Sequence, residues 1–164
     1  MGREVRMVPS DWQHPMDEHG EYIPLLQEPW EKRAAAWDLG AVKWAEGLRE
    51  DFVNEGQWVP KKPDEIGCTY EEWAGCRPCK EDYMPTFAPG TATHYMMYET
   101  CTEGTPISPA FETSEKLARW LVDNSASAFG DQGASYEGWL RVAKGGYAPS
   151  MVLDSGGLRS GVEL

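Results

Sequence analysis

Basic side chains are scarce in this chain. Its 164 residues include 27 Asp and Glu against 15 Lys and Arg, which gives a formal net charge of −12. Binding to nucleic acid phosphates or to an anionic membrane depends on Lys and Arg that neutralise negative charge. We therefore expect no direct nucleic acid binding and no membrane binding. The acidic surface favours either simple solubility or attraction to a basic partner protein.

The excess of negative charge lies in the first two thirds of the chain. Residues 1–66 hold 14 acidic and 8 basic side chains, and residues 67–112 hold 7 and 2. Residues 113–164 are nearly balanced, with 6 acidic and 5 basic side chains. A basic partner is therefore expected to meet the surface formed by residues 1–112, which carries a net charge of −11.

Long apolar runs are missing as well. No segment approaches the length of about 20 apolar residues that a membrane-spanning helix needs. Residues 1–10 lack the apolar core of a secretory signal peptide. We therefore expect a cytoplasmic protein, in which thiols stay reduced and cysteines bind metal more often than they form disulfides.

Signatures of common enzymes are absent too. The chain has no G-x-S-x-G elbow, no phosphate-binding glycine loop and no dinucleotide fingerprint. One group of residues has the chemistry of a hydrolase site, because carboxylates and imidazoles can bind a metal ion or act as a general base. Its members are Asp11, His14, Asp17, Glu18 and His19. A solvated polar segment has the same composition. The sequence therefore leaves enzymatic activity open, and it favours a protein that is not an enzyme.

Four cysteines lie within 34 residues of one another, and they are Cys68, Cys76, Cys79 and Cys101. The middle two form a C-x-x-C pair. Four thiolates complete the tetrahedral coordination of a structural zinc ion, so we predict zinc at these residues, with His94 as an alternative ligand. Two alternatives remain open at this point, buried free thiols and a disulfide.

An amphipathic helix is predicted over residues 29–54. Apolar residues recur there at alternating steps of four and three, which places them on one face of a helix. They are Trp30, Ala34, Trp37, Ala41, Trp44 and Leu48, with Phe52 extending the stripe. The three tryptophans form a ridge that either faces the core or provides a homodimer or partner-binding seam.

Shorter elements separated by turn residues follow. Residues 93–100 and 107–111 are expected to pair as a hairpin. Thr113 and Ser135 are good N-caps for two helices. A second hairpin is expected within residues 151–162.

The fold class that these elements indicate is α+β. We expect a single domain in which one long amphipathic helix packs on a small antiparallel sheet, beside a helical pair and a zinc-stapled loop. Residues 1–55 would hold an extended segment and the long helix, and residues 56–66 a linker. Residues 67–164 would hold the cysteine loop, the hairpin and the C-terminal helices. Two compact lobes are the alternative.

Several stretches of the chain carry a resemblance to known proteins. They are Val8-Pro9-Ser10-Asp11-Trp12-Gln13-His14-Pro15, Tyr98-Glu99-Thr100-Cys101-Thr102-Glu103-Gly104-Thr105-Pro106-Ile107-Ser108-Pro109-Ala110-Phe111, the helix 115–121, Ala126-Ser127-Ala128-Phe129-Gly130, Tyr136-Glu137-Gly138-Trp139-Leu140 and Ser160-Gly161-Val162. Together they resemble a group of small uncharacterised proteins of tailed bacteriophages and prophages. The resemblance implies a viral or prophage gene expressed in the bacterial host cytoplasm. It includes no catalytic motif, so it implies no functional residues.

These observations favour an acidic interaction protein of phage origin. It would bind a host or phage protein, with inhibition of a bacterial defence or nucleic-acid enzyme as one outcome. The alternatives are a metal-dependent enzyme that uses the cluster from Asp11 to His19, and a virion or assembly component. A homodimer through Trp30, Trp37 and Trp44 is compatible with each of them.

Overall fold

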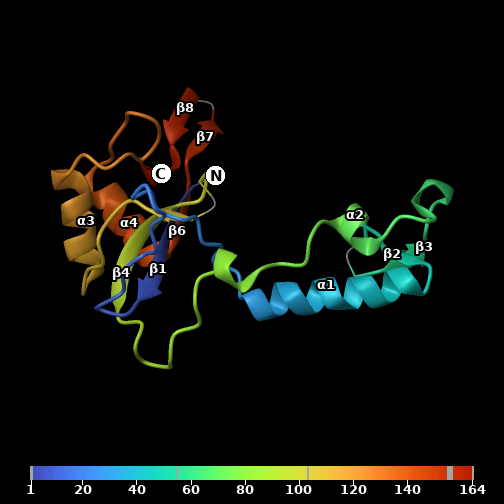
Figure 1. Cartoon of the computed structure of the whole chain (residues 1–164). Helices are drawn as coiled ribbons and strands as arrows, with labels where there is room; N and C mark the ends of the chain where they lie inside the picture. Colours follow the sequence, from blue (N-terminus) through green and yellow to red (C-terminus); the bar gives the residue numbers. More distant parts are fainter. Residues whose placement is uncertain (1, 55, 103, 155–156, 164) are drawn as a thin grey trace. The chain divides into compact units, whose positions relative to one another are not determined.

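The computed structural model describes residues 2–54, 56–102, 104–154 and 157–163. Within them the fold is mixed α+β, with a small antiparallel sheet and four helices (Figure 1). The chain divides into two compact units. Met1–Gln27 and Pro85–Leu164 form the first, called here the sheet unit. Glu28–Met84 form the second, the inserted unit, which contains the residues predicted as a linker.

The sheet unit is built on four antiparallel strands in the order β5-β4-β1-β6. Their bounds are Gly2–Val8 for β1, His94–Glu99 for β4, Thr105–Pro106 for β5 and Tyr147–Pro149 for β6. The central pair is β1 with β4, in a register that runs from Arg3 opposite Glu99 to Val8 opposite His94. β1 is one of the two inner strands of the sheet, and it was not predicted from its sequence.

One face of this sheet is covered by two helices, α3 at Ser114–Asp123 and α4 at Tyr136–Gly145. Both predicted N-caps are confirmed. The Thr113 hydroxyl accepts from the Lys116 N–H at 3.1 Å, and the Ser135 hydroxyl accepts from the Gly138 N–H at 3.1 Å. Such caps satisfy donors that have no partner in the first turn of a helix.

The hydrophobic core lies between these helices and the sheet. Its members are buried side chains from β4, α3, α4 and the segments that follow them. They are Met97, Leu117, Ala118, Leu121, Ala128, Trp139, Val142, Ala143, Ala148 and Val162. Fully burying a side chain such as Leu or Met contributes about 1.5–3 kcal/mol. The core is therefore the main source of stability for this unit.

The opposite face of the sheet is covered by residues 9–27. Side chains alternate between faces along a strand, and directly paired residues point the same way. Met97 faces the helices, so its neighbour Tyr98 points to the other face, together with Arg6 from β1. The Leu25 N–H donates to the Gly104 carbonyl at 3.2 Å and ties the covering segment down. This face carries the candidate site described below.

The first hairpin is present, but its second strand differs from the predicted one over residues 107–111. β4 pairs instead with β5 at Thr105–Pro106, and Phe111 adds one isolated bridge to Tyr95. The second predicted hairpin is also present. It joins β7, Met151–Asp154, to β8, Gly157–Ser160.

The inserted unit begins with α1, Trp30–Ala45. The predicted helix extended to residue 54, but the observed helix ends earlier because Gly47 adopts a φ of 86°. A hairpin of β2, Leu48–Glu50, and β3, Trp58–Pro60, follows. This hairpin occupies positions predicted to be the end of the helix and the linker.

A short helix, α2, then packs on α1 at Tyr70–Ala74. The contact is close, since a Cβ atom added to Gly40 of α1 would lie 1.9 Å from the Tyr70 hydroxyl. Gly40 therefore makes room for the Tyr70 ring.

Candidate functional site

The three tryptophans of the ridge on α1 contact one segment of their own chain, residues 68–78, which includes α2. The indole N–H of Trp44 donates to the carbonyl of Cys68 at 2.9 Å. Trp37 donates to Gly75 at 3.0 Å, and Trp30 donates to Pro78 at 2.9 Å. The ridge thus binds the segment that carries three of the four cysteines, which fits the core-facing alternative. A homodimer through these tryptophans stays a prediction.

The four predicted zinc ligands are divided between the two units. Cys68, Cys76 and Cys79 belong to the inserted unit, whereas Cys101 and the alternative ligand His94 belong to the sheet unit. All four thiols are free. Within the described ranges, no group of three or more His, Cys, Asp or Glu is arranged to hold a metal ion. Zinc at these cysteines therefore stays a prediction.

Two of the thiols are in surroundings that disfavour the thiolate, which is the form that binds metal. A hydrogen bond with the Glu71 carboxylate, together with the charge of that group, raises the pKa of Cys76. Burial and the neighbouring Glu99 raise the pKa of Cys101. A bound cation would be needed to reverse both effects.

The cluster of residues from Asp11 to His19 does not converge on one point. His14 is buried, while His19 is exposed, with its Nε2 atom 3.5 Å from a carboxylate oxygen of Glu18. Asp17 accepts hydrogen bonds from the backbone N–H groups of His19 and Glu21, at 2.8 and 2.9 Å. Its carboxylate therefore stabilises a turn.

Both ring nitrogens of His14 are engaged in hydrogen bonds. Nε2 lies 2.6 Å from the Ile23 carbonyl, which can only accept, so Nε2 carries the proton. Nδ1 then accepts from the Tyr98 hydroxyl at 3.2 Å. Burial is the main cause that lowers the pKa of His14, the charge of Arg6 adds to it, and the Ile23 hydrogen bond opposes it. The imidazole is neutral, with no lone pair left for a metal ion or a substrate proton.

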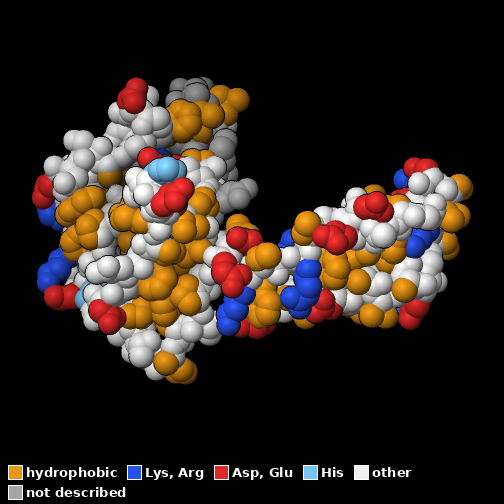
Figure 2. All heavy atoms as spheres, viewed as in Figure 1, with side chains coloured by type: hydrophobic (Ala, Val, Ile, Leu, Met, Phe, Trp, Pro, Cys, Tyr) orange, Lys and Arg blue, Asp and Glu red, His pale blue; other side chains and the backbone are white. Residues whose placement is uncertain are grey.

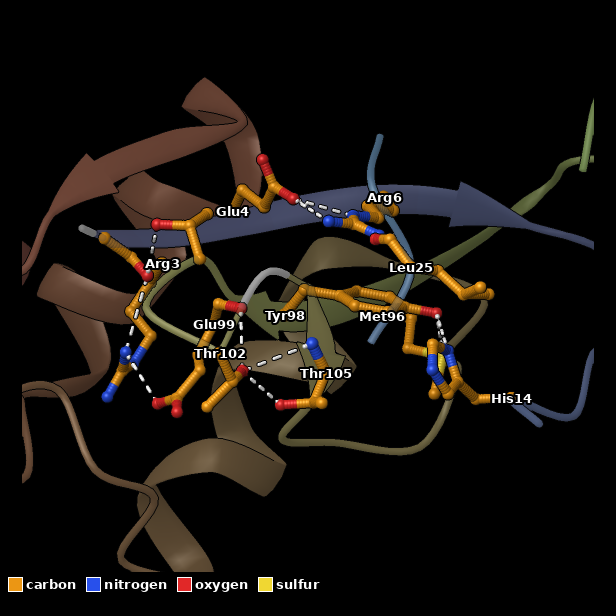
Figure 3. A network of polar contacts seen from close by, with 12 residues as sticks. Arg3, Glu4, Arg6, His14, Leu25, Met96, Tyr98, Glu99, Thr102 and Thr105 are labelled. Atoms are coloured by element: carbon orange, nitrogen blue, oxygen red, sulfur yellow. Dashed lines mark hydrogen bonds and ion pairs between the residues drawn. The ribbon is translucent and has the colours of Figure 1, made fainter. Parts of the chain in front are cut away.

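A polar network continues from His14 along the sheet (Figure 3). The Tyr98 hydroxyl also accepts from the indole N–H of Trp12 at 3.2 Å. The Arg6 guanidinium lies over the Tyr98 ring, 4.3 Å from its centroid, and donates to Glu4 and to the Leu25 carbonyl. Burial raises the pKa of Tyr98. The network therefore fixes residues 12–25 against the sheet.

A groove of about 1000 Å³ opens beside this network. It lies between the covering segment and residues 106–110, which begin at the last residue of β5, and Trp120 of α3 contributes to it. Its lining is mainly aromatic, aliphatic and proline side chains. The lining residues are Ser10, Trp12, Gln13, His14, Pro15, Met16, Tyr22, Met96, Pro106, Ile107, Ser108, Pro109, Ala110 and Trp120. Within this set, Met16 and Tyr22 are 52 % and 43 % exposed, so the groove presents apolar surface to solvent.

The rim of the groove is acidic. Met16 and Tyr22 pair across the base of a turn, and Asp17, Glu18 and Glu21 lie exposed in that turn. No Lys or Arg occurs between residues 7 and 31. In the space-filling view, apolar side chains are widely exposed on the visible face of the sheet unit (Figure 2). An apolar groove with an acidic rim suits a ligand that carries both apolar and basic groups.

No family model, curated protein or solved structure matches the chain. Among the helices of the described residues, none has both the length and the apolar character to cross a membrane. Sequence analysis assigned no role to the groove, because its two walls are about 90 residues apart in the chain. The available signal was the density of aromatic residues and prolines within residues 9–24.

Proposed function

We propose that this protein binds another protein, and that the partner inserts apolar side chains into the groove while its basic side chains meet the acidic rim. The observation that carries the proposal is the combination of apolar lining, exposed Met16 and Tyr22, and a turn with three exposed carboxylates and no Lys or Arg. Apolar contacts would supply most of the affinity, and the charges would supply orientation and association rate.

The chemistry of the site supports binding more than turnover. His14 is the one imidazole in the groove lining, and both its nitrogens are occupied by Ile23 and Tyr98. The resemblance to small phage proteins implies a host or phage protein as the partner, in bacterial cytoplasm. Inhibition of a defence or nucleic-acid enzyme would follow if the partner's basic surface is the one that it uses for nucleic acid.

Affinity capture from bacterial lysate with the full chain as bait identifies the partner, and a titration with the purified partner then measures the dissociation constant. The double variant Met16→Ala/Tyr22→Ala removes exposed groove side chains and leaves the core intact. We expect it to weaken binding by about tenfold or more, in line with the loss of interface anchors. Leu153→Ala is the matched control, since Leu153 is 77 % exposed on β7 and does not line the groove.

Salt dependence tests the role of the rim. Binding that weakens as ionic strength rises, and that also weakens in Asp17→Asn/Glu21→Gln, supports the proposal. Two results oppose it. One is equal binding by the Met16→Ala/Tyr22→Ala and Leu153→Ala variants. The other is a purified protein that has no saturable partner and instead converts a small molecule.

A further inference from the structure

The inserted unit has a pocket of its own, with a volume of about 290 Å³. It lies among α1, the hairpin of β2 and β3, and α2. Four aromatic rings line it, from Trp37, Phe52, Tyr70 and Trp73, and the Glu50 carboxylate is beside them. Phe52 is 71 % exposed, so the pocket opens to solvent. An open pocket of this size accommodates one side chain or a small molecular group.

The rings meet at different angles. Trp37 and Tyr70 are 5.1 Å apart at their centroids, with an angle of 62° between their planes. Phe52 stacks on Trp73 at 5.3 Å and 16°. The pocket wall therefore contains rings in more than one orientation. Because the face of an aromatic ring carries partial negative charge, a ring face that is open to the pocket attracts a cation.

The carboxylate of Glu50 adds full negative charge. Within the part of the chain that the structure describes, it forms no ion pair. Burial and the charge of Glu50 together raise the pKa of Tyr70, so the carboxylate acts electrostatically on at least one ring of the pocket. The inserted unit as a whole has 13 acidic and 8 basic side chains. Charge complementarity therefore points to a positively charged ligand.

The same unit already places its own cations over other tryptophans. Lys61 Nζ lies 3.9 Å from the ring centroid of Trp44, and the Arg77 guanidinium lies 5.6 Å from that of Trp30. The pocket has one basic residue in its lining, Arg33, whose guanidinium pairs with Glu28 at 3.4 Å. Among the described cation–π contacts, none involves a ring of the pocket.

We propose that this pocket binds an organic cation, and that the natural source of the cation is a Lys or Arg side chain of the partner protein. The inference rests on the proposed function, since it supplies that binding with a second contact site. The rings contact the alkyl part and the charged head of the side chain, and Glu50 pairs with the head.

The test uses the full chain and small analogues of the two side chains. n-Butylguanidinium and n-butylammonium are titrated while tryptophan fluorescence and the indole N–H signals in NMR spectra are followed. n-Butanol is the uncharged control of similar shape. We expect saturable shifts at indole signals of the inserted unit with both cations, and at least twofold weaker binding of n-butanol, the lower end of a cation–π contribution.

Variants identify the groups responsible. Glu50→Gln and Phe52→Leu should each weaken cation binding by about twofold to fivefold, because one removes the charge and the other replaces an aromatic face by an aliphatic side chain. Glu46→Gln is the matched control, as it removes a carboxylate from the same unit outside the pocket. Equal binding of n-butanol, or unchanged affinity in both Glu50→Gln and Phe52→Leu, would overturn the inference.

The two proposals can fail separately. If the analogues do not bind but the partner still binds in a way that depends on Met16 and Tyr22, the cation pocket is wrong and the proposed function stands. If the analogues bind through Glu50 and Phe52 while no protein partner exists, the pocket is real. Its ligand would then be a small organic cation, and the assignment to a partner side chain would be wrong.

Discussion

The sheet unit and the inserted unit satisfy their polar groups by different means. In the sheet unit, strands pair with strands, and two arginines of β1 are buried with carboxylate partners. Arg3 pairs with Glu99 at 3.0 Å, and Arg6 pairs with Glu4. In the inserted unit, three tryptophans of α1 donate to carbonyls on either side of α2. Side chains there supply hydrogen bonds that backbone N–H groups supply within the sheet.

This difference explains how α1 holds the segment from Cys68 to Pro78, which includes the short helix α2. The carbonyls of Cys68, Gly75 and Pro78 lie outside that helix, and each accepts from an indole of α1. The heptad spacing of Trp30, Trp37 and Trp44 puts one indole donor on the same helix face every two turns. Each indole also buries a large apolar surface, so it combines packing with a hydrogen bond. Repeated tryptophans can thus act both as core residues and as hydrogen-bonding partners.

The largest effects should come from truncating the central tryptophan of each unit. Trp139 is fully buried in the sheet unit, and Trp44 is 5 % exposed in the inserted unit. We expect Trp139→Ala and Trp44→Ala each to lower the free energy of unfolding by about 3–5 kcal/mol. Amide hydrogen exchange separates the two units. Trp44→Ala should accelerate exchange within residues 28–84, and Trp139→Ala in the rest. Equal acceleration throughout both variants would mean that the chain unfolds as one cooperative domain.

The buried arginine of the sheet unit should come second. Arg6 is 4 % exposed, and Arg6→Met leaves the Glu4 carboxylate without its cation. Breaking such a pair costs about 3 kcal/mol or more, as a loss of unfolding free energy in urea. The double variant Arg6→Met/Glu4→Gln also removes the unpaired charge of Glu4, so it should recover part of the lost unfolding free energy. A double variant no more stable than Arg6→Met would show that Arg6 acts mainly through Tyr98 and Leu25.

Local sequence signals were sufficient for about half of the elements. Thr113 and Ser135 were identified as N-caps, and both hairpins were expected from turn residues between β-forming stretches. These signals depend on residues within one or two turns of each other. The end of α1 at Ala45 also has a local cause, which is Gly47. The helix was predicted to continue because the apolar stripe extends through Leu48 and Phe52.

Elements that depend on distant pairing were missed. β1 contains Arg3, Glu4 and Arg6, and charged residues in a sequence usually indicate an exposed segment. The two arginines are buried because β4, more than 80 residues away, provides Glu99 beside Arg3 and Tyr98 beside Arg6. The groove also depends on residues that are distant in the sequence, since residues 10–22 and 106–110 form its two walls. The cysteine spacing likewise does not reveal that Cys101 belongs to a different unit from the other three.

A smaller effect is expected from removing a single indole donor. Trp37→Phe keeps an aromatic ring on the ridge but loses the hydrogen bond to the Gly75 carbonyl. Because this bond is exposed to solvent, the loss should be about 0.5–1 kcal/mol in unfolding free energy. Trp12→Phe is the matched change in the sheet unit. It removes the indole donor from the buried Tyr98 hydroxyl, so it should cost more. A larger loss in Trp37→Phe would reverse the ranking of the two units.

The smallest effect concerns pH and belongs to the sheet unit alone. Burial lowers the pKa of His14 in the folded chain, so the unfolded chain binds a proton more readily. The stability that neutral His14 provides is complete above the unfolded pKa of about 6.5, and it is lost as pH falls through the folded value. The melting temperature should therefore decrease between pH 7.5 and pH 5.5. His14→Gln should flatten this decrease, whereas His19→Gln, at an exposed position, should retain it. An equal slope in both variants would show that carboxylates, and not His14, cause the loss.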